Sequence, residues 1–139
     1  MSELADCFRK FDVSESLVKD FVELTGDSNP IHSVSDCVES TSSPLEKVAP
    51  GSLLVSLFTA ILGSEMPGSG TVILKLSAHF MKPVVVGQNI CLQVQVTKRE
   101  KLTHTLRIQG LFSDEKGTKL CKVESLVLFK GQDNQKWNS

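Results

Sequence analysis

The sequence predicts an α+β protein with a single domain, in which a curled antiparallel sheet wraps around a buried central helix. Three observations predict this arrangement: an apolar helical stretch in mid-chain, alternating apolar and polar residues in the second half, and turn signals between the alternating segments. With 139 residues, 40% of them apolar and 22% charged, the chain is long enough for one domain with its own core. The expected domain covers residues 1–131, and residues 132–139 form a polar tail.

The first predicted element is an amphipathic helix, because apolar side chains recur at three- and four-residue spacing. Ser14 or Asp12 would cap this helix, and Gly26 would end it. Its apolar positions are Leu17, Val18, Phe21, Val22 and Leu24. From 27 to 50 the periodicity fails, which predicts a long irregular segment, and such loops in compact domains are usually functional or disordered.

The second predicted element is the central helix, residues 52–63, which is apolar on nearly every side and lies between Pro50-Gly51 and Gly63. A helix that is hydrophobic all round is expected to be buried on all sides. The period then changes to two, which predicts strands at about 72–80, 90–97, 102–112 and 120–129. Turn signals at 86–89, 98–101 and 113–117 separate them, so we expect mainly antiparallel, hairpin-like pairing.

Composition excludes several classes of function. A net charge of −1 lacks the basic excess that nucleic-acid binding requires. The run Leu53–Gly63 is far shorter than the roughly 20 residues that cross a bilayer, so we expect no membrane span. The acidic start, Met-Ser-Glu-Leu-Ala-Asp, is unlike a secretory or transit signal, and we expect an intracellular protein, in the cytoplasm or in an organelle matrix such as that of a mitochondrion or peroxisome.

Metal and disulfide chemistry are not expected either. The four cysteines lie thirty or more residues apart without a CxxC pair, which predicts reduced thiols. His79 and His104 have no second ligand at metal-binding spacing, so no metal site and no cofactor are predicted.

Inside the irregular segment, Asp27, Asn29 and His32 place an acid, an amide and an imidazole within six residues. A carboxylate and a histidine on a rigid turn suit general acid–base catalysis, because histidine titrates near neutral pH. The alternative is a purely structural Asx turn, in which Asp27 and Asn29 satisfy loop backbone groups, Pro30 fixes a bend and His32 lies on the surface.

The order of residues 21–32, Phe-x-x-Leu-Thr-Gly-Asp-x-Asn-Pro-Ile-His, closely resembles the signature of the MaoC-like, (R)-specific enoyl-thioester hydratases, which are hot-dog-fold enzymes. Residues 51–58, 62–71 and 80–87 also look like that family's central helix, following turn and next strand. The resemblance covers about residues 11 to 129, and it is specific because its motifs agree with the separately predicted helix and sheet.

The resemblance implies a role for each motif residue. Asp27 and His32 would act on the water and on the carbons of an α,β-unsaturated acyl thioester, while Asn29 would hold the loop. The thioester carbonyl would lie near the backbone N–H of Gly51, where a helix start offers unpaired donors and a positive dipole.

Three positions near that helix start depart from the family pattern. Pro50 replaces a common His, Ser52 replaces a Met, and Thr59 stands where a Ser often lines the site. Ser52 and Thr59 are therefore predicted to contribute to substrate binding, and the departures affect substrate range more than chemistry.

The leading hypothesis is a hydro-lyase that interconverts trans-2-enoyl and (R)-3-hydroxyacyl thioesters in fatty-acid metabolism. Two alternatives stay open: a hot-dog acyl-thioester hydrolase, and a non-catalytic acyl-binding subunit. The substrate would be a thioester of coenzyme A or of an acyl-carrier protein, and the acyl chain length is left open. One such unit leaves one sheet edge and one pocket wall open, and the family pairs its units edge to edge, so the resemblance implies a homodimer.

Overall fold

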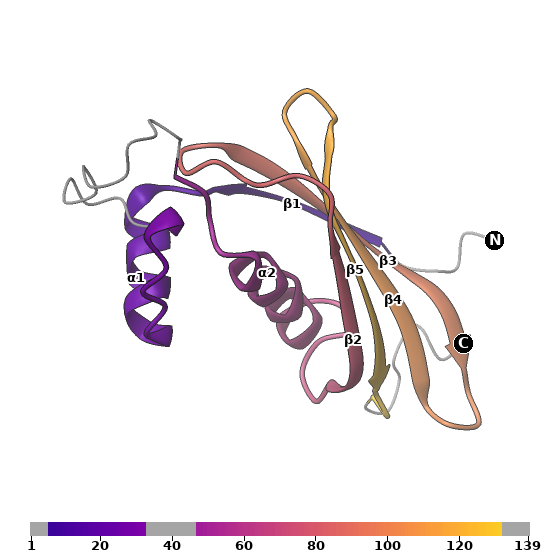
Figure 1. The fold of residues 1–139 in the computed structure, drawn as a ribbon. Helices are drawn as coiled ribbons and strands as arrows, with labels where there is room; N and C mark the ends of the chain where they lie inside the picture. The colour runs from indigo at the N-terminus through magenta and orange to yellow at the C-terminus, as the bar shows by residue number, and fades with distance from the viewer. Residues whose placement is uncertain (1–5, 33–46, 132–139) are drawn as a thin grey trace.

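The computed structural model describes residues 6–32 and 47–131, so the predicted tail at 132–139 lies outside the described residues. The elements are β1 (Asp6–Asp12), α1 (Glu15–Thr25), a 3₁₀ turn (Pro30–His32), α2 (Gly51–Ser64), β2 (Val72–Phe80), β3 (Asn89–Glu100), β4 (Thr105–Asp114) and β5 (Lys119–Leu128). The strands form one antiparallel sheet in the order β1-β3-β4-β5-β2, and α2 lies along one face of it (Figure 1). The predicted α+β arrangement, an antiparallel sheet with a central helix packed against it, is confirmed.

β3, β4 and β5 pair as the predicted hairpins. The two edge strands, β1 and β2, each pair with a strand that does not follow them directly in the chain. β2 pairs with β5 rather than with β3, the next strand in the chain, so residues 81–88 carry the chain across the sheet. β1 pairs with β3 and was not predicted, because its alternation places Arg9 among the residues of the helix-covered face. Arg9 forms an ion pair with Glu65, just beyond α2, which explains a charged residue on that face.

The β3–β4 turn lies later than the sequence predicts. β3 continues to Glu100, where Glu100 pairs with Thr105, so the predicted turn at 98–101 is mostly strand and Leu102 is an exposed turn residue. The charged residues that suggested a turn are tolerated in the strand because much of its end is exposed to solvent.

The core lies between α2 and the inner face of the sheet. Phe58, in the middle of α2, packs directly on Gly110 of β4, where a Cβ atom would be only 2.5 Å from the phenyl ring. The buried residues of α2 are Leu53, Leu54, Phe58, Ile61 and Leu62. Ser52, Ser56 and Ala60 are exposed in the single chain, so the prediction that α2 is buried on all sides is wrong: the sheet covers one side of the helix and does not close around it.

The first helix matches its predicted ends. Ser14 is the N-cap, and its Oγ accepts a hydrogen bond from the Leu17 N–H at 3.1 Å. Gly26 ends the helix in the left-handed region, with φ of 76°. Leu24 is 83% exposed, so its predicted place on the packed face is wrong; the packed stripe centres on Val18, which is fully buried.

Candidate active site

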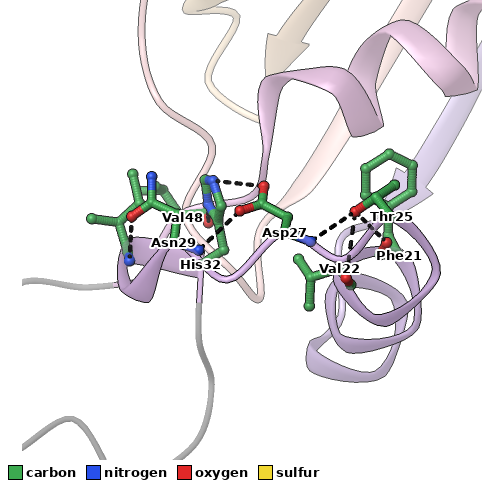
Figure 2. A network of polar contacts seen from close by, with 8 residues as sticks. Phe21, Val22, Thr25, Asp27, Asn29, His32 and Val48 are labelled. Atoms are coloured by element: carbon green, nitrogen blue, oxygen red, sulfur yellow. Dashed lines mark hydrogen bonds and ion pairs between the residues drawn. The ribbon is translucent and has the colours of Figure 1, made fainter.

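The loop that carries the motif leaves α1 through a tightly bonded helix end. Thr25 Oγ1 donates a hydrogen bond to the Phe21 carbonyl at 3.0 Å, and the Asp27 N–H donates to the Val22 carbonyl at 3.1 Å. These contacts fix the direction in which the chain leaves the helix, and with it the position of Asp27 (Figure 2).

Asp27 and Asn29 shape the turn that follows. The Asn29 N–H donates to Asp27 Oδ1 at 2.9 Å, and the Ile31 N–H donates to Asn29 Oδ1 at 3.2 Å. The His32 N–H donates to the Asn29 carbonyl at 3.0 Å and closes the 3₁₀ turn. The structural alternative is therefore right about the backbone contacts of Asp27 and Asn29, but it is wrong about His32, which is only 9% exposed.

His32 is held in one orientation by a backbone carbonyl. Its Nδ1 lies 2.7 Å from the Val48 oxygen, and because a carbonyl only accepts, Nδ1 carries the hydrogen. In the neutral ring the lone pair is then on Nε2, which lies 3.6 Å from Asp27 Oδ2 (Figure 2). That separation is too long for a direct hydrogen bond, so the two atoms are placed to share a bridging water or a substrate proton. The Asp27 side chain is 31% exposed, which leaves the pair reachable from outside.

Val48 connects this turn to the start of α2. It forms an isolated antiparallel bridge with Val85, and its N–H donates to the Ile31 carbonyl at 2.9 Å. Because Val48 precedes Gly51 by three residues, at most about 11 Å of chain separates them. The Asp27–His32 pair and the first turn of α2 are therefore parts of one connected unit.

The first turn of α2 offers unpaired backbone donors. The helix begins at Gly51 after Pro50, which makes no side-chain capping bond, and the first turn contains no acidic residue. Over the described residues, no acceptor is recorded for the N–H groups of Gly51 and Ser52, as expected for the first residues of a helix. An approaching oxygen that carries partial negative charge would find donors and a favourable dipole there.

The remaining predicted positions, Ser52 and Thr59, lie on α2. Ser52 is exposed, and within the described part of the chain its hydroxyl makes no hydrogen bond. Thr59 is half-buried and donates through Oγ1 to the Ser56 carbonyl at 3.1 Å. The structure thus brings together Asp27, Asn29 and His32 and joins them to Gly51, whereas Ser52 and Thr59 make no hydrogen bond to this group.

Two features of the candidate site are not predicted by the sequence. The Val48 carbonyl gives no signal in a sequence, because any residue supplies the same oxygen. Phe80 is predicted as an apolar strand position and as the start of the 80–87 motif, but its contact with Gly51 is not: a Cβ atom on Gly51 would lie 2.7 Å from Phe80 Cε1. Residue spacing does not reveal that an aromatic residue at the end of a strand contacts a glycine at the start of a helix.

Residues 6–32 and 47–131 contain no group of three His, Cys, Asp or Glu side chains suited to holding a metal ion. No helix among them combines the length and the apolar character needed to cross a membrane.

Comparison with known proteins identifies the family. A family model described as a MaoC like domain matches residues 7–112, which is more than half of the chain. The chain belongs to the MaoC-like domain family. Within it, the (R)-specific enoyl-CoA hydratase of Rhodospirillum rubrum is 33% identical over 123 residues, which cover 86% of this chain and 76% of the relative.

Another MaoC-like relative, the (R)-specific enoyl-CoA hydratase of Aeromonas caviae, is 35% identical over 89 residues. This match covers 64% of each chain, which is less than two thirds of the length of the A. caviae hydratase. The solved structure of the A. caviae (R)-hydratase involved in PHA biosynthesis superposes with a TM-score of 0.82 and 25% identity, over 93% of this chain and 97% of that one. The predicted hot-dog fold is confirmed.

Proposed function

We propose that this MaoC-like protein is a hydro-lyase that interconverts trans-2-enoyl thioesters and (R)-3-hydroxyacyl thioesters. The observation that carries the proposal is the His32 Nε2 lone pair facing Asp27 Oδ2 at 3.6 Å, with the ring fixed by the Val48 carbonyl. The printed activities of the relatives, (R)-specific enoyl-CoA hydratases, support the same reaction.

The reaction adds one water across the C2=C3 double bond. A water held between Nε2 and Oδ2 gives its hydroxyl to C3 and its other proton to the pair, and the pair delivers one proton to C2, so that it returns to its starting state. Asp27 and His32 share these two transfers, and Asn29 keeps Asp27 in place through its backbone N–H. The charge that develops on the thioester oxygen would be stabilised by the Gly51 N–H and the α2 dipole.

The test is the loss of the conjugated enoyl-thioester absorbance when purified protein is mixed with crotonyl and longer trans-2-enoyl thioesters. Asp27→Ala and His32→Ala should each lower kcat by about 10²–10⁴-fold, the usual contribution of a general acid or base. His79→Ala is the matched control, because His79 is exposed and points to the other face of the sheet. Near-full activity in both site variants would refute the proposal.

The same assay separates the two alternatives. Release of free thiol from saturated acyl thioesters would indicate a hydrolase. Binding of a thioester by well-folded protein, without turnover at any chain length, would indicate a non-catalytic subunit.

We further propose that the substrate carrier is coenzyme A or an acyl-carrier protein, inside the cell, in the cytoplasm or an organelle matrix. Comparing turnover of a crotonyl group on coenzyme A with turnover of the same group on an acyl-carrier protein distinguishes the two carriers. A fluorescent fusion of the full chain distinguishes the compartments.

The active form is proposed to be a homodimer that pairs through β2. This strand is a sheet edge with open backbone groups, and its apolar side chains Val72, Leu74 and Phe80 are each about half exposed. Light scattering should give twice the mass of the chain, and a monomer at assay concentration would contradict this part of the proposal.

A further inference from the structure

We propose that Phe80 is a positioning residue of the thioester site: its ring shields one side of the α2 N–H donors from water and directs the carbonyl to the other side. This inference rests on the proposed hydratase function, because it concerns the donors that would hold the thioester oxygen.

The ring is placed by the end of the edge strand. Phe80 is the last residue of β2 and pairs with the buried Cys121 on the inner face of the sheet. From there the side chain reaches the start of α2, where a Cβ atom on Gly51 would lie 2.7 Å from Cε1 and 2.8 Å from Cζ. In the single chain the rest of the ring is open, since 51% of Phe80 is exposed. A large apolar group therefore lies against Gly51, the residue that carries the first unpaired N–H of α2.

An apolar wall at this place has a chemical consequence. Backbone donors at an exposed helix start are hydrated, and a substrate carbonyl must displace that water. A ring in contact with the Gly51 backbone removes water from one side and lowers the local dielectric, which strengthens the interaction with a developing negative charge. The same ring blocks one approach, so the carbonyl enters from the side that is left open.

The contact also explains why residue 51 is a glycine. Its backbone is helical and does not lie in the left-handed region, so its conformation does not require glycine. Alanine would by itself favour the helix. The ring of Phe80 is the neighbour that a Cβ atom would strike, and positions 51 and 80 are therefore coupled.

The coupling is tested with Gly51→Ala, Phe80→Ala and the double variant in the hydration assay. Gly51→Ala should lower kcat/KM by about 10²-fold, because the ring or the helix start must shift by about 1 Å. Phe80→Ala should lower kcat by roughly tenfold with a smaller change in KM, since the wall acts on developing charge. The double variant should be no worse than Phe80→Ala alone. Phe80→Leu should retain most activity, because it keeps an apolar wall.

Two controls exclude trivial causes. Phe8→Ala removes a phenylalanine of similar exposure, 53%, from the opposite edge strand and should leave activity unchanged. Light scattering on Phe80→Ala separates the loss of the wall from the loss of the dimer.

A spectroscopic measurement keeps this inference separable from the proposed function. The absorption band of a bound cinnamoyl thioester moves to longer wavelength when donors polarise its carbonyl, and no turnover is needed in an Asp27→Asn background. Phe80→Ala should reduce that shift, and Phe80→Leu should preserve it. Losses that multiply in the double variant, or a band shift unaffected by Phe80→Ala, would overturn the role of Phe80 even if the protein is a hydratase. If the parent protein does not hydrate the substrate but still shifts the band of the bound cinnamoyl thioester, the proposed hydratase function is overturned and the role of Phe80 beside the donors is retained.

Discussion

Gly110→Ala tests the packing that holds α2 on the sheet. The added Cβ would lie 2.5 Å and 2.7 Å from the Phe58 ring and 3.2 Å from Leu92 Cδ1. Carbon atoms normally pack at about 3.5–4.0 Å, so the ring must move by about 1 Å. Phe58 is fully buried, so its ring cannot move without displacing other core side chains. We therefore expect a loss of about 1–3 kcal/mol in the free energy of unfolding, as for other overpacked cores.

The sign of the effect makes the test decisive. Without a steric conflict, alanine in a strand should stabilise the protein by about 0.5–1 kcal/mol relative to glycine. Chemical denaturation followed by circular dichroism gives the free energy, and a thermal scan should show a fall in Tm of about 4 °C per kcal/mol for a chain of this size. Phe58→Leu should recover part of the loss, so the double variant should be more stable than additivity predicts. A stability for Gly110→Ala equal to or above that of the parent would refute the packing argument.

Three further predictions concern single groups. Burial raises the pKa of the Cys121 thiol from 9.0 to about 11. The stabilising contribution of the buried thiol is therefore complete below pH 9 and falls as the pH rises towards 11. The free energy of unfolding should decline more steeply over this pH range in the parent than in Cys121→Ala, and equal slopes would contradict the prediction. Nitrogen-15 NMR of the neutral ring of His32 should show the hydrogen on Nδ1, where Val48 accepts it, and a hydrogen on Nε2 would be inconsistent with the site. Ser14→Ala should cost about 1 kcal/mol of stability, with recovery in Ser14→Asp, and an unchanged denaturation midpoint would show that the cap contributes nothing.

The fold was predictable where a periodic pattern coincides with burial. The strand at Val72–Phe80 has its predicted bounds, and Gly26 ends α1 because its left-handed backbone favours glycine. The strand at Asp6–Asp12 was missed because charged residues interrupt its apolar pattern, and one of them is compensated by Glu65, far along the chain. A sequence pattern contains no information about such a distant partner.

Part of the candidate site was also predictable from the sequence, and part was not. The proximity of Asp27 and His32 follows from a short, turn-rich motif, and the structure places their side chains 3.6 Å apart. The orientation of the imidazole depends on the carbonyl of Val48, sixteen residues away, and the crowding at Gly51 depends on Phe80. Both are tertiary contacts, so composition and spacing could not predict them.

The connection through Val48 bears on which thioester reaction the site favours. One carbonyl holds the imidazole, and three residues later the chain presents the first N–H of α2, so the proposed acid–base pair and the unpaired backbone donors are close along the chain but separate. Hydration needs this separation, because protons are exchanged at C2 and C3 while charge develops on the carbonyl oxygen. Hydrolysis instead requires the activated water to attack the carbonyl carbon, directly beside the donors. Since residue 48 is fixed by both Ile31 and Val85, the pair has little freedom to move towards that carbon, and this limited freedom supports the proposal of addition to the double bond over hydrolysis.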